Sequence, residues 1–491
     1  MKIISRFVRE QQRYLKSELQ SGFFPNGEQG VEKFIKDLKA YGVLKTVKMS
    51  PEEKNLSELM EESEIISDEF ADNDEYYYVF NYVGVVTIGK RIIKVYPKYI
   101  MLKDEPLLEM KQVLKVLQKY NNSQEQIVNI YNGSGENKSF NILAIILFMM
   151  SDYYENGIYN NSEDIIEVNG EGAILWGKTI DETFALIQDE RPYYMELYTA
   201  KTIDDDMDFF KRLHEAILTE CTKQLETTHL MELFDMIPAD LSEEEIEDFG
   251  DTEYVLDRIQ AELNIQYNTR KQILLKTMYA YISQNRKLMD EKYGISMFGT
   301  TAFNMVWEKV CASVFNNKLN TTLEGLKLAA KIAEGYDENT KLIDLIEKPK
   351  WITTDGYVHT AKETLTPDLI AVETHENIDY FVILDAKYYN IQLESGSMIS
   401  GNPGIGDVTK QYLYQLAYKK FLEDHCIIHI NNCFLMPTEG KKIQDKGQAQ
   451  INILYGLGLK NIQIRLLPAV DMYKHYLANT HMEIRELLLC E

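Results

Sequence analysis

The chain has 491 residues, enough for two or three domains that each bury a hydrophobic core. Hydrophobic residues make up 45% of it, and its longest apolar run, Ile142–Met150, is too short to span a bilayer, so we expect no membrane segment. The formal net charge of −25 argues against tight DNA binding by this chain alone, because duplex DNA binding relies on a basic surface.

The cysteines and the N-terminus indicate the compartment. The five cysteines are scattered along the sequence and form no CxxC pair. This pattern favours reduced thiols and argues against a structural zinc site. Met1 begins a charged, amphipathic stretch without the apolar centre of a secretory signal. We therefore expect a cytoplasmic protein that does not associate with a membrane.

The acidic residues are concentrated in two segments. The range 51–75 holds eleven Asp or Glu residues against the single Lys54, and we expect it to be a solvated loop or a poorly ordered excursion. The range 241–257 is similarly acidic. Elsewhere the balance is closer to neutral, so the charge does not exclude DNA cleavage by a complex in which a partner grips the DNA.

The N-terminal half predicts mixed helix and strand. An apolar stripe predicts a helix over 31–41, and apolar runs over 76–86 and 91–96 predict a hairpin around Ile88-Gly89-Lys90. Helices are expected over 107–120 and 141–154. The stretch 168–181, VNGEGAILWGKTID, is typical of a glycine-rich turn between strands. It does not complete a phosphate-binding loop, because the strand–loop–helix context is missing.

The second half predicts a helical region followed by alternating helices and strands. The range 204–287 is expected to be mostly helical, with helices over 209–225 and 273–282 and a capping box at 242–245. An amphipathic helix over 302–315 carries Glu308 off the centre of its apolar stripe. A hairpin over 366–387, a glycine-rich loop over 395–406, a helix over 407–422 with Asp407 as N-cap, and strands over 426–435 and 461–467 follow.

The hairpin Thr366–Lys387 carries the residues that could take part in catalysis. Side chains alternate along a strand, so Asp385 and Lys387 project from one face, and we expect Asp368 on the partner strand to face them. Two carboxylates and one ammonium suit metal-assisted hydrolysis of a phosphodiester, because carboxylate oxygens hold Mg²⁺ and the ion activates water. The same residues also fit a surface hairpin that ends in a solvated ion pair, since Asp-x-Lys is common.

Three stretches resemble known proteins. Pro367-Asp368 followed by Asp385-Ala386-Lys387 resembles the PD-(D/E)xK nuclease signature. The hairpin sequence YVFNYVGVVTIGKRIIKVYPKYI resembles the N-terminal region of McrC-type proteins, and VNGEGAILWGKTID resembles a stretch in their LlaJI-like branch. The chain is therefore similar to McrC-type restriction nuclease subunits, and more closely to the LlaJI branch.

This resemblance implies an α+β or mixed α/β fold and a set of site residues. It implies a partner-docking domain over 1–200, a helical connector over 201–290 and a restriction-endonuclease-like α/β core over 291–491. In the implied site Asp368, Asp385 and Lys387 are catalytic, with Glu308 and Gln411 as secondary members. Asp368, Asp385 and Glu308 would bind Mg²⁺, with Mn²⁺ as a substitute. Gln415 stands four residues after Gln411, where a strict QxxxY pattern has tyrosine.

The resemblance also implies partners. It implies a DNA endonuclease of a restriction system that works with a separately encoded McrB-like AAA+ GTPase. We expect that partner to dock on Tyr76–Tyr99, where Lys90, Arg91, Lys94 and Lys98 gather. Two other classes stay open: a self-sufficient nuclease, and a non-catalytic adaptor that stimulates an AAA+ motor. Whether the DNA target is methylated or unmodified is also open.

Overall fold

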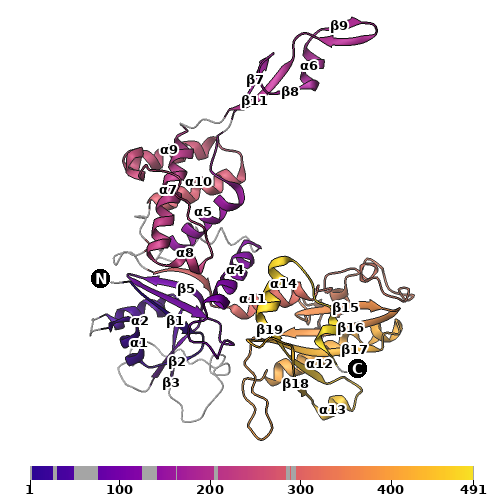
Figure 1. Ribbon diagram of the computed structural model, residues 1–491. Helices are drawn as coiled ribbons and strands as arrows, with labels where there is room; N and C mark the ends of the chain where they lie inside the picture. Colours follow the sequence, from indigo (N-terminus) through magenta and orange to yellow (C-terminus); the bar gives the residue numbers. More distant parts are fainter. Residues whose placement is uncertain are drawn as a thin grey trace. The chain divides into compact units, whose positions relative to one another are not determined.

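The computed structural model describes residues 3–25, 30–48, 76–123, 141–161, 163–203, 208–283, 288 and 295–489. Within these residues the fold is mixed α/β, as predicted (Figure 1). The acidic range 51–75, expected to be a loop, lies outside the described residues. None of the described helices is long and apolar enough to cross a membrane.

Contacts divide the chain into two compact units. The first joins Met1–Asn129 to Met297–Glu491, and the second is Ile130–Ser296. Direct hydrogen bonds link the two parts of the first unit: Tyr99 Oη donates to Tyr473 Oη at 3.0 Å, and Lys119 Nζ donates to the Tyr476 carbonyl at 2.6 Å. The functional boundaries expected after residues 200 and 290 stay a prediction, but by contacts the N-terminal 129 residues belong with the C-terminal part.

The N-terminal part of the first unit contains two small sheets. One has the order β1-β6-β5-β12 and the other β2-β4-β3. The elements are β1 (Ile4–Arg9), β2 (Arg13–Tyr14), α1 (Lys16–Phe23), α2 (Val31–Ala40), β3 (Leu44–Lys48), β4 (Tyr76–Phe80), β5 (Val83–Ile88), β6 (Arg91–Tyr96), α4 (Leu107–Ser123) and β12 (Ile295–Thr300).

The predicted hairpin is confirmed for β5 and β6, which pair antiparallel. The extent of its first strand was wrong: the predicted range 76–86 splits into β4 and β5, which belong to different sheets. A glycine allows β12 to pair with β5 at the edge of the sheet β1-β6-β5-β12. A Cβ on Gly84, whose φ is +145°, would lie 2.1 Å from the Phe298 carbonyl oxygen, so only glycine lets β5 approach β12 this closely.

The C-terminal part of the first unit is built on a five-stranded sheet with the order β15-β16-β17-β19-β18. β15 and β16 pair antiparallel as the predicted hairpin, whereas β16, β17 and β19 run parallel. The strands are β15 (Leu369–His375), β16 (Ile378–Ala386), β17 (His429–Thr438), β18 (Gln444–Ala449) and β19 (Ile462–Pro468). The remaining elements are α11 (Phe303–Val314), η5 (Glu324–Leu326), η6 (Leu342–Leu345), β13 (Lys350–Ile352), β14 (Val358–Thr360), α12 (Ile405–Asp424), α13 (Asn452–Tyr455), α14 (Ala469–Ala478) and η7 (Ile484–Leu487).

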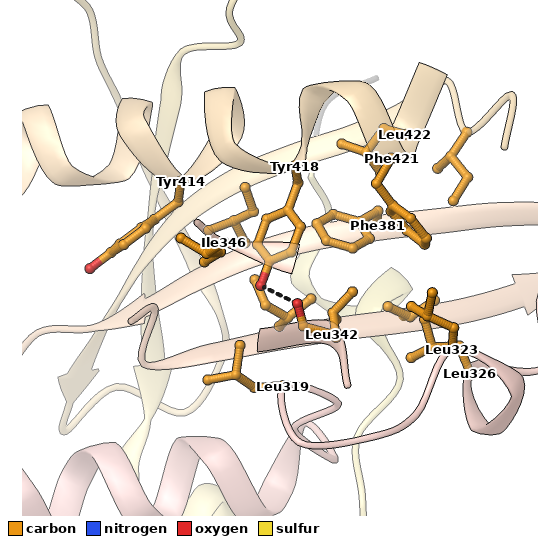
Figure 2. Packing of buried hydrophobic residues seen from close by; sticks show 14 residues of the cluster. Leu319, Leu323, Leu326, Leu342, Ile346, Phe381, Tyr414, Tyr418, Phe421 and Leu422 are labelled. Carbon is orange, nitrogen blue, oxygen red and sulfur yellow. Dashed lines mark hydrogen bonds between the residues drawn. The ribbon is translucent and has the colours of Figure 1, made fainter. Parts of the chain in front are cut away.

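Helices cover both faces of this sheet, with α12 on one side and α11 and α14 on the other (Figure 1). On the α12 side, Phe381 of β16 packs against Tyr418, with ring centroids 5.2 Å apart. Figure 2 shows these two rings beside Leu342, whose carbonyl accepts a hydrogen bond from Tyr418 Oη at 3.3 Å. The hairpin β15–β16 is therefore a core element and not a surface hairpin.

The second unit is mainly helical, as predicted for 204–287. Its helices are α5 (Ile142–Asn156), α6 (Trp176–Glu182), α7 (Phe209–Thr227), α8 (Leu230–Leu233), η4 (Ile246–Phe249), α9 (Thr252–Ile265) and α10 (Thr269–Ser283). Its strands are β7 (Glu163–Val168), β8 (Ala173–Ile174), β9 (Ala185–Gln188), β10 (Arg191–Tyr194) and β11 (Tyr198–Ile203). The helix start predicted at 242–245 was wrong. The next α-helix begins at Thr252, because Asp251 caps it by accepting a hydrogen bond from the Tyr254 backbone N–H at 2.8 Å.

Candidate active site

The end of the β15–β16 hairpin brings Asp368 and Asp385 together. In the strand register Leu369 lies opposite Leu384, so the next residue outward on each strand is one of the two aspartates. Asp368 Oδ2 accepts a hydrogen bond from the Ala386 backbone N–H at 2.9 Å, which fixes its carboxylate beside β16. The predicted pairing of the two carboxylates is therefore present in the structure.

Asn317 holds the start of the strand that presents Asp368. Its side-chain Nδ2 donates to the Asp368 carbonyl at 3.1 Å, and its Oδ1 accepts from the Ile370 backbone N–H at 3.1 Å. Asn317 follows shortly after α11, so it ties this helix to the first strand of the hairpin.

Lys387 lies between two carboxylates. Its Nζ is 3.0 Å from Asp385 Oδ2 and 3.0 Å from Asp407 Oδ1, and its backbone N–H donates to the Leu435 carbonyl at 2.9 Å. The side chains of Asp385 and Lys387 are only 8% and 18% exposed. This ion pair is mostly buried, which does not fit the alternative of a solvated surface pair.

Asp407 is the residue whose role the sequence did not predict. It was expected to be the N-cap of its helix, but α12 begins at Ile405 with Gly404 as N-cap, so Asp407 stands inside the first turn. There its carboxylate is free to pair with Lys387. The sequence did contain a signal for this ion pair: Asp407 lies near the start of the helix that follows the D-x-K strand.

Glu308 lies close enough to the hairpin end to share its electrostatic field. Its neighbour Trp307 donates from Nε1 to the Leu435 carbonyl at 3.1 Å, the same carbonyl that accepts from the Lys387 backbone. Burial raises the pKa of Glu308, Lys387 lowers it and Asp385 raises it. The structure therefore brings Glu308, Asp368, Asp385 and Lys387 into one neighbourhood.

The carboxylates of this neighbourhood resist ionisation. Burial and the nearby Asp368 carboxylate raise the pKa of Asp385 to about 7. Burial, followed by the charge of Glu308, raises the pKa of Asp368. For Lys387, burial lowers the pKa, but Asp385 and Asp407 outweigh it and raise the pKa above its ordinary value. Lys387 is thus a permanent cation beside carboxyl groups that are ready to bind a proton or a cation.

Gln411 is buried in α12, one turn after Asp407. Its side-chain amide has no hydrogen-bond partner among the described residues, and its backbone carbonyl accepts from Asn432 Nδ2 at 3.1 Å. No contact joins the amide to the aspartates, so Gln411 lies near the site without being part of its ion-pair network.

Tyr414 is an aromatic residue whose pKa is affected by the charges of the site. Burial, and then the charges of Asp385 and Asp368, raise its pKa to about 12. Its hydroxyl donates to the Thr366 carbonyl at 3.0 Å, two residues before Asp368. Gln415, at the position of the expected tyrosine, instead donates from Nε2 to the Lys460 carbonyl at 2.9 Å. The helical spacing from Gln411 to the aromatic is therefore three residues and not four.

The donor set fits Mg²⁺ through two ligands. In the described part of the chain, no group of three or more His, Cys, Asp or Glu side chains is arranged to hold a metal ion. Lys387 Nζ lies 3.0 Å from Asp385 Oδ2, and the Ala386 N–H donates to Asp368 Oδ2 at 2.9 Å, so one oxygen of each carboxylate faces a protein partner. Mg²⁺ keeps several waters and needs only one or two protein carboxylates, so Asp368 and Asp385 suffice for it.

Three of the four cations expected to face a partner at Tyr76–Tyr99 are engaged within the first unit. Lys98 Nζ donates to Gln11 Oε1 at 2.9 Å and lies 4.6 Å from the centre of the Tyr388 ring. Arg91 Nε donates to the Phe23 carbonyl at 2.8 Å, and Lys94 Nζ lies 4.8 Å from the Phe7 ring centre. Most residues of β5 and β6 are buried, so this segment offers little free surface for docking.

Comparison with known proteins decides the family. A sequence profile of the family described as LlaJI restriction endonuclease matches residues 82–464, most of the chain. The chain belongs to the LlaJI restriction endonuclease family. All the candidate residues from Glu308 to Gln411, and Asp407 with them, lie inside the range that matches the LlaJI family. The predicted resemblance to this branch is confirmed.

Similar individual proteins include one curated relative and two solved structures. The chain is 27% identical over 408 residues to the type II restriction enzyme BsuMI component YdjA of Bacillus subtilis (strain 168), a match that covers 82% of this chain and 81% of that protein. It is 12% identical to a chain of a Thermococcus gammatolerans assembly of McrB AAA+ hexamers with bound McrC, covering 97% and 99% of the two chains with a TM-score of 0.35. A second match, in the Thermococcus gammatolerans McrBC complex, is 13% identical and covers 62% and 85% with a TM-score of 0.24. At these TM-scores neither structure supports a functional conclusion.

Proposed function

We propose that this LlaJI-family chain is a metal-dependent DNA endonuclease subunit of a restriction system, with its active site at Asp368, Asp385 and Lys387. The observation that carries the proposal is the end of the β15–β16 hairpin, where the buried Asp385 and the half-buried Asp368, both of raised pKa, lie beside a lysine cation. Perturbed carboxyl groups gathered around one cation are typical of catalytic sites.

Asp368 and Asp385 would hold Mg²⁺, or Mn²⁺ in its place. When bound, such an ion supplies a Lewis acid that activates water and neutralises negative charge on the phosphate. Because burial favours the protonated form of Asp385, cation binding competes with a proton at this residue, and affinity rises with pH.

Lys387 contributes positive charge and not proton transfer. Its pKa is raised by Asp385 and Asp407, so it stays protonated and cannot serve as a general base near neutral pH. Held by these carboxylates, its ammonium is positioned to stabilise the negative charge that develops on a phosphodiester. Glu308 and Gln411 would be secondary members: Glu308 adds negative charge near the cation site, and Gln411 offers an unpartnered amide nearby.

A non-catalytic adaptor that stimulates an AAA+ motor is the second candidate. The observation that favours it is the Asp385–Lys387–Asp407 ion-pair chain, which is also a reasonable structural salt bridge. Metal binding separates the two candidates, because only a nuclease of this kind needs a cation at the aspartates.

Titration of the purified chain with Mg²⁺ or Mn²⁺ by calorimetry, at a pH above that at which Asp385 ionises, tests the proposal. We expect one site that Asp385→Asn abolishes, because the amide removes a carboxylate ligand while keeping the side-chain shape. Asp471→Asn, which changes an exposed carboxylate on α14, serves as the matched control and should bind metal normally. Equal metal binding by wild type and Asp385→Asn would favour the adaptor.

A further inference from the structure

The residue that follows Lys387 in the chain points to the opposite side of the sheet. Lys387 pairs with Asp407 of α12 on one side. On the other side, the ring of Tyr388 lies 5.3 Å from the ring of Phe303 on α11. Tyr388 is only 7% exposed, and its hydroxyl donates to Glu10, which is 5% exposed and directly follows β1. The backbone of the candidate catalytic lysine is therefore tied to a buried contact with the N-terminal part of the first unit.

Glu10 and Lys98 form the N-terminal side of this contact. Glu10 Oε2, which accepts from the Tyr388 hydroxyl, also accepts from the Lys98 backbone N–H at 3.1 Å. Lys98 Nζ lies 4.6 Å from the centre of the Tyr388 ring and 5.7 Å from the centre of the Tyr389 ring. The Lys98 carbonyl accepts from Asn390 Nδ2 at 2.8 Å. Three consecutive residues after the D-x-K strand therefore contact this one pair.

The same segment leads to the second carboxylate that pairs with the lysine. Gln392 and Ser400 form an isolated antiparallel bridge that closes a loop. Gly401 then returns to Asn390, because a Cβ on Gly401, whose φ is +62°, would lie 2.2 Å from the Asn390 carbonyl oxygen. The helix α12, with Asp407 in its first turn, begins shortly afterwards. The ion pair of the site therefore flanks one segment whose base is held at Asn390.

The chemistry of Glu10 makes this contact specific. Burial raises the pKa of Glu10, whereas the charge of Lys98 and the hydrogen bond from Tyr388 lower it. These two partners therefore stabilise the carboxylate inside the protein. Hydrogen bonds to an ionised acceptor are among the stronger ones, and a buried carboxylate cannot turn to water instead. The contact therefore favours one position of the segment over the alternatives.

We propose that Glu10 and Tyr388 are positioning residues of the candidate active site, which fix the segment after Lys387 and so hold its ammonium where charge develops on the phosphate. This inference rests on the proposed function, because it gives the N-terminal part a role in the same reaction. Position matters for such a cation, since a misplacement of about 1 Å can lower a rate about a hundredfold. Lys98 then serves the interior of the unit and not a docking surface.

Hydrogen exchange of the full-length chain, measured by mass spectrometry without metal or DNA, tests whether the segment is held. The Lys387 backbone N–H donates to the Leu435 carbonyl at 2.9 Å, so exchange over 387–392 reports on the position of this segment. In Tyr388→Phe, exchange over 387–392 should become about tenfold faster or more relative to exchange in β16. The reason is that loss of a buried hydrogen bond permits local opening while the strand stays paired.

Tyr473→Phe is the matched control. It removes a similarly buried hydroxyl, which accepts from the Tyr99 hydroxyl at 3.0 Å, and should leave the exchange ratio unchanged. Glu10→Gln keeps an acceptor for the Tyr388 hydroxyl and should stay close to wild type, whereas Glu10→Leu should behave like Tyr388→Phe. Equal ratios in Tyr388→Phe and Tyr473→Phe would overturn the proposal, as would a Glu10→Gln chain that exchanges as fast as Glu10→Leu.

Steady-state DNA cleavage by the complex that co-purifies with the tagged chain separates positioning from a purely structural contact. Tyr388→Phe should lower kcat about tenfold or more and leave KM and Mg²⁺ affinity unchanged, because Asp368 and Asp385 remain in place. Tyr473→Phe should cut like wild type. Faster exchange in Tyr388→Phe with a wild-type kcat would overturn the positioning role. Absence of cleavage by wild type would instead refute the proposed nuclease function, and the exchange ratios would still decide whether Glu10 and Tyr388 hold the segment.

Discussion

At the scale of single residues, the account depends on two aspartates that the fold keeps from ionising freely. Asp385 is placed on β16 between Asp368 and Lys387, and its pKa reflects burial first and the neighbouring carboxylate second. The sequence was sufficient to predict that both aspartates and Lys387 lie together, because strand alternation and the D-x-K spacing are local. It was insufficient for Asp407 and Tyr414, whose roles depend on how α12 packs against the strand ends.

The raised pKa of Asp385 predicts how stability depends on pH. Between the ordinary value of 3.8 and about 7, the folded chain binds more protons at Asp385 than the unfolded chain does. The free energy of unfolding of the metal-free chain should therefore fall as pH rises through this window. In Asp385→Asn, the decrease in the free energy of unfolding that comes from residue 385 should disappear. Urea unfolding at several pH values measures it, and parallel pH profiles for wild type and variant would contradict the assignment.

At the scale of elements, one tyrosine connects the hairpin to its surroundings. Tyr388 directly follows Lys387, and its hydroxyl donates to Glu10, which is buried in the N-terminal part. Its ring lies 5.3 Å from the ring of Phe303, on the helix that carries Glu308. Hairpin and helices were predictable from their apolar periodicity. This junction was not, because it joins residues far apart in the sequence.

Tyr388→Phe should destabilise the first unit while leaving its ring packing intact. Removal of the hydroxyl leaves the buried Glu10 carboxylate with fewer hydrogen bonds, and such a loss costs about 1–3 kcal/mol. Tyr357→Phe, at an exposed position, should leave the free energy of unfolding unchanged. Denaturant unfolding of the two variants would test this, and equal stability would show that the Tyr388–Glu10 contact contributes nothing.

At the scale of the whole molecule, the chain combines a nuclease-like unit with a second unit of different character. The first 129 residues pack with the C-terminal part, a grouping that the sequence did not predict because no local pattern reports such distant contacts. The second unit exposes large apolar side chains around β9: Phe184 is 97% exposed and Ile187 is 78% exposed. An exposed apolar surface of this kind is typical of a protein interface.

We propose that an AAA+ partner of the kind that the resemblance to McrC-type proteins implies docks on this surface and not on Tyr76–Tyr99. Replacing Phe184 and Ile187 by Ser in the full chain should abolish association with the partner and GTP-dependent DNA cleavage, because the apolar contacts would be lost. Thermal unfolding of the chain alone should be unchanged, since both residues are exposed. Co-purification from the host measures the association. Normal association of the double variant would place the interface elsewhere.

Cleavage of plasmid DNA, supplied in both methylated and unmodified form together with GTP and Mg²⁺, by the material that co-purifies with a tag on this chain tests the central claim most directly. Removal of a ligand for the catalytic cation should lower the rate by several orders of magnitude, so Asp385→Asn complexes should associate normally and leave the plasmid intact. Asp471→Asn complexes should cut like wild type. Cutting by the Asp385→Asn complex at the wild-type rate would contradict the assignment of the active site to the end of the β15–β16 hairpin.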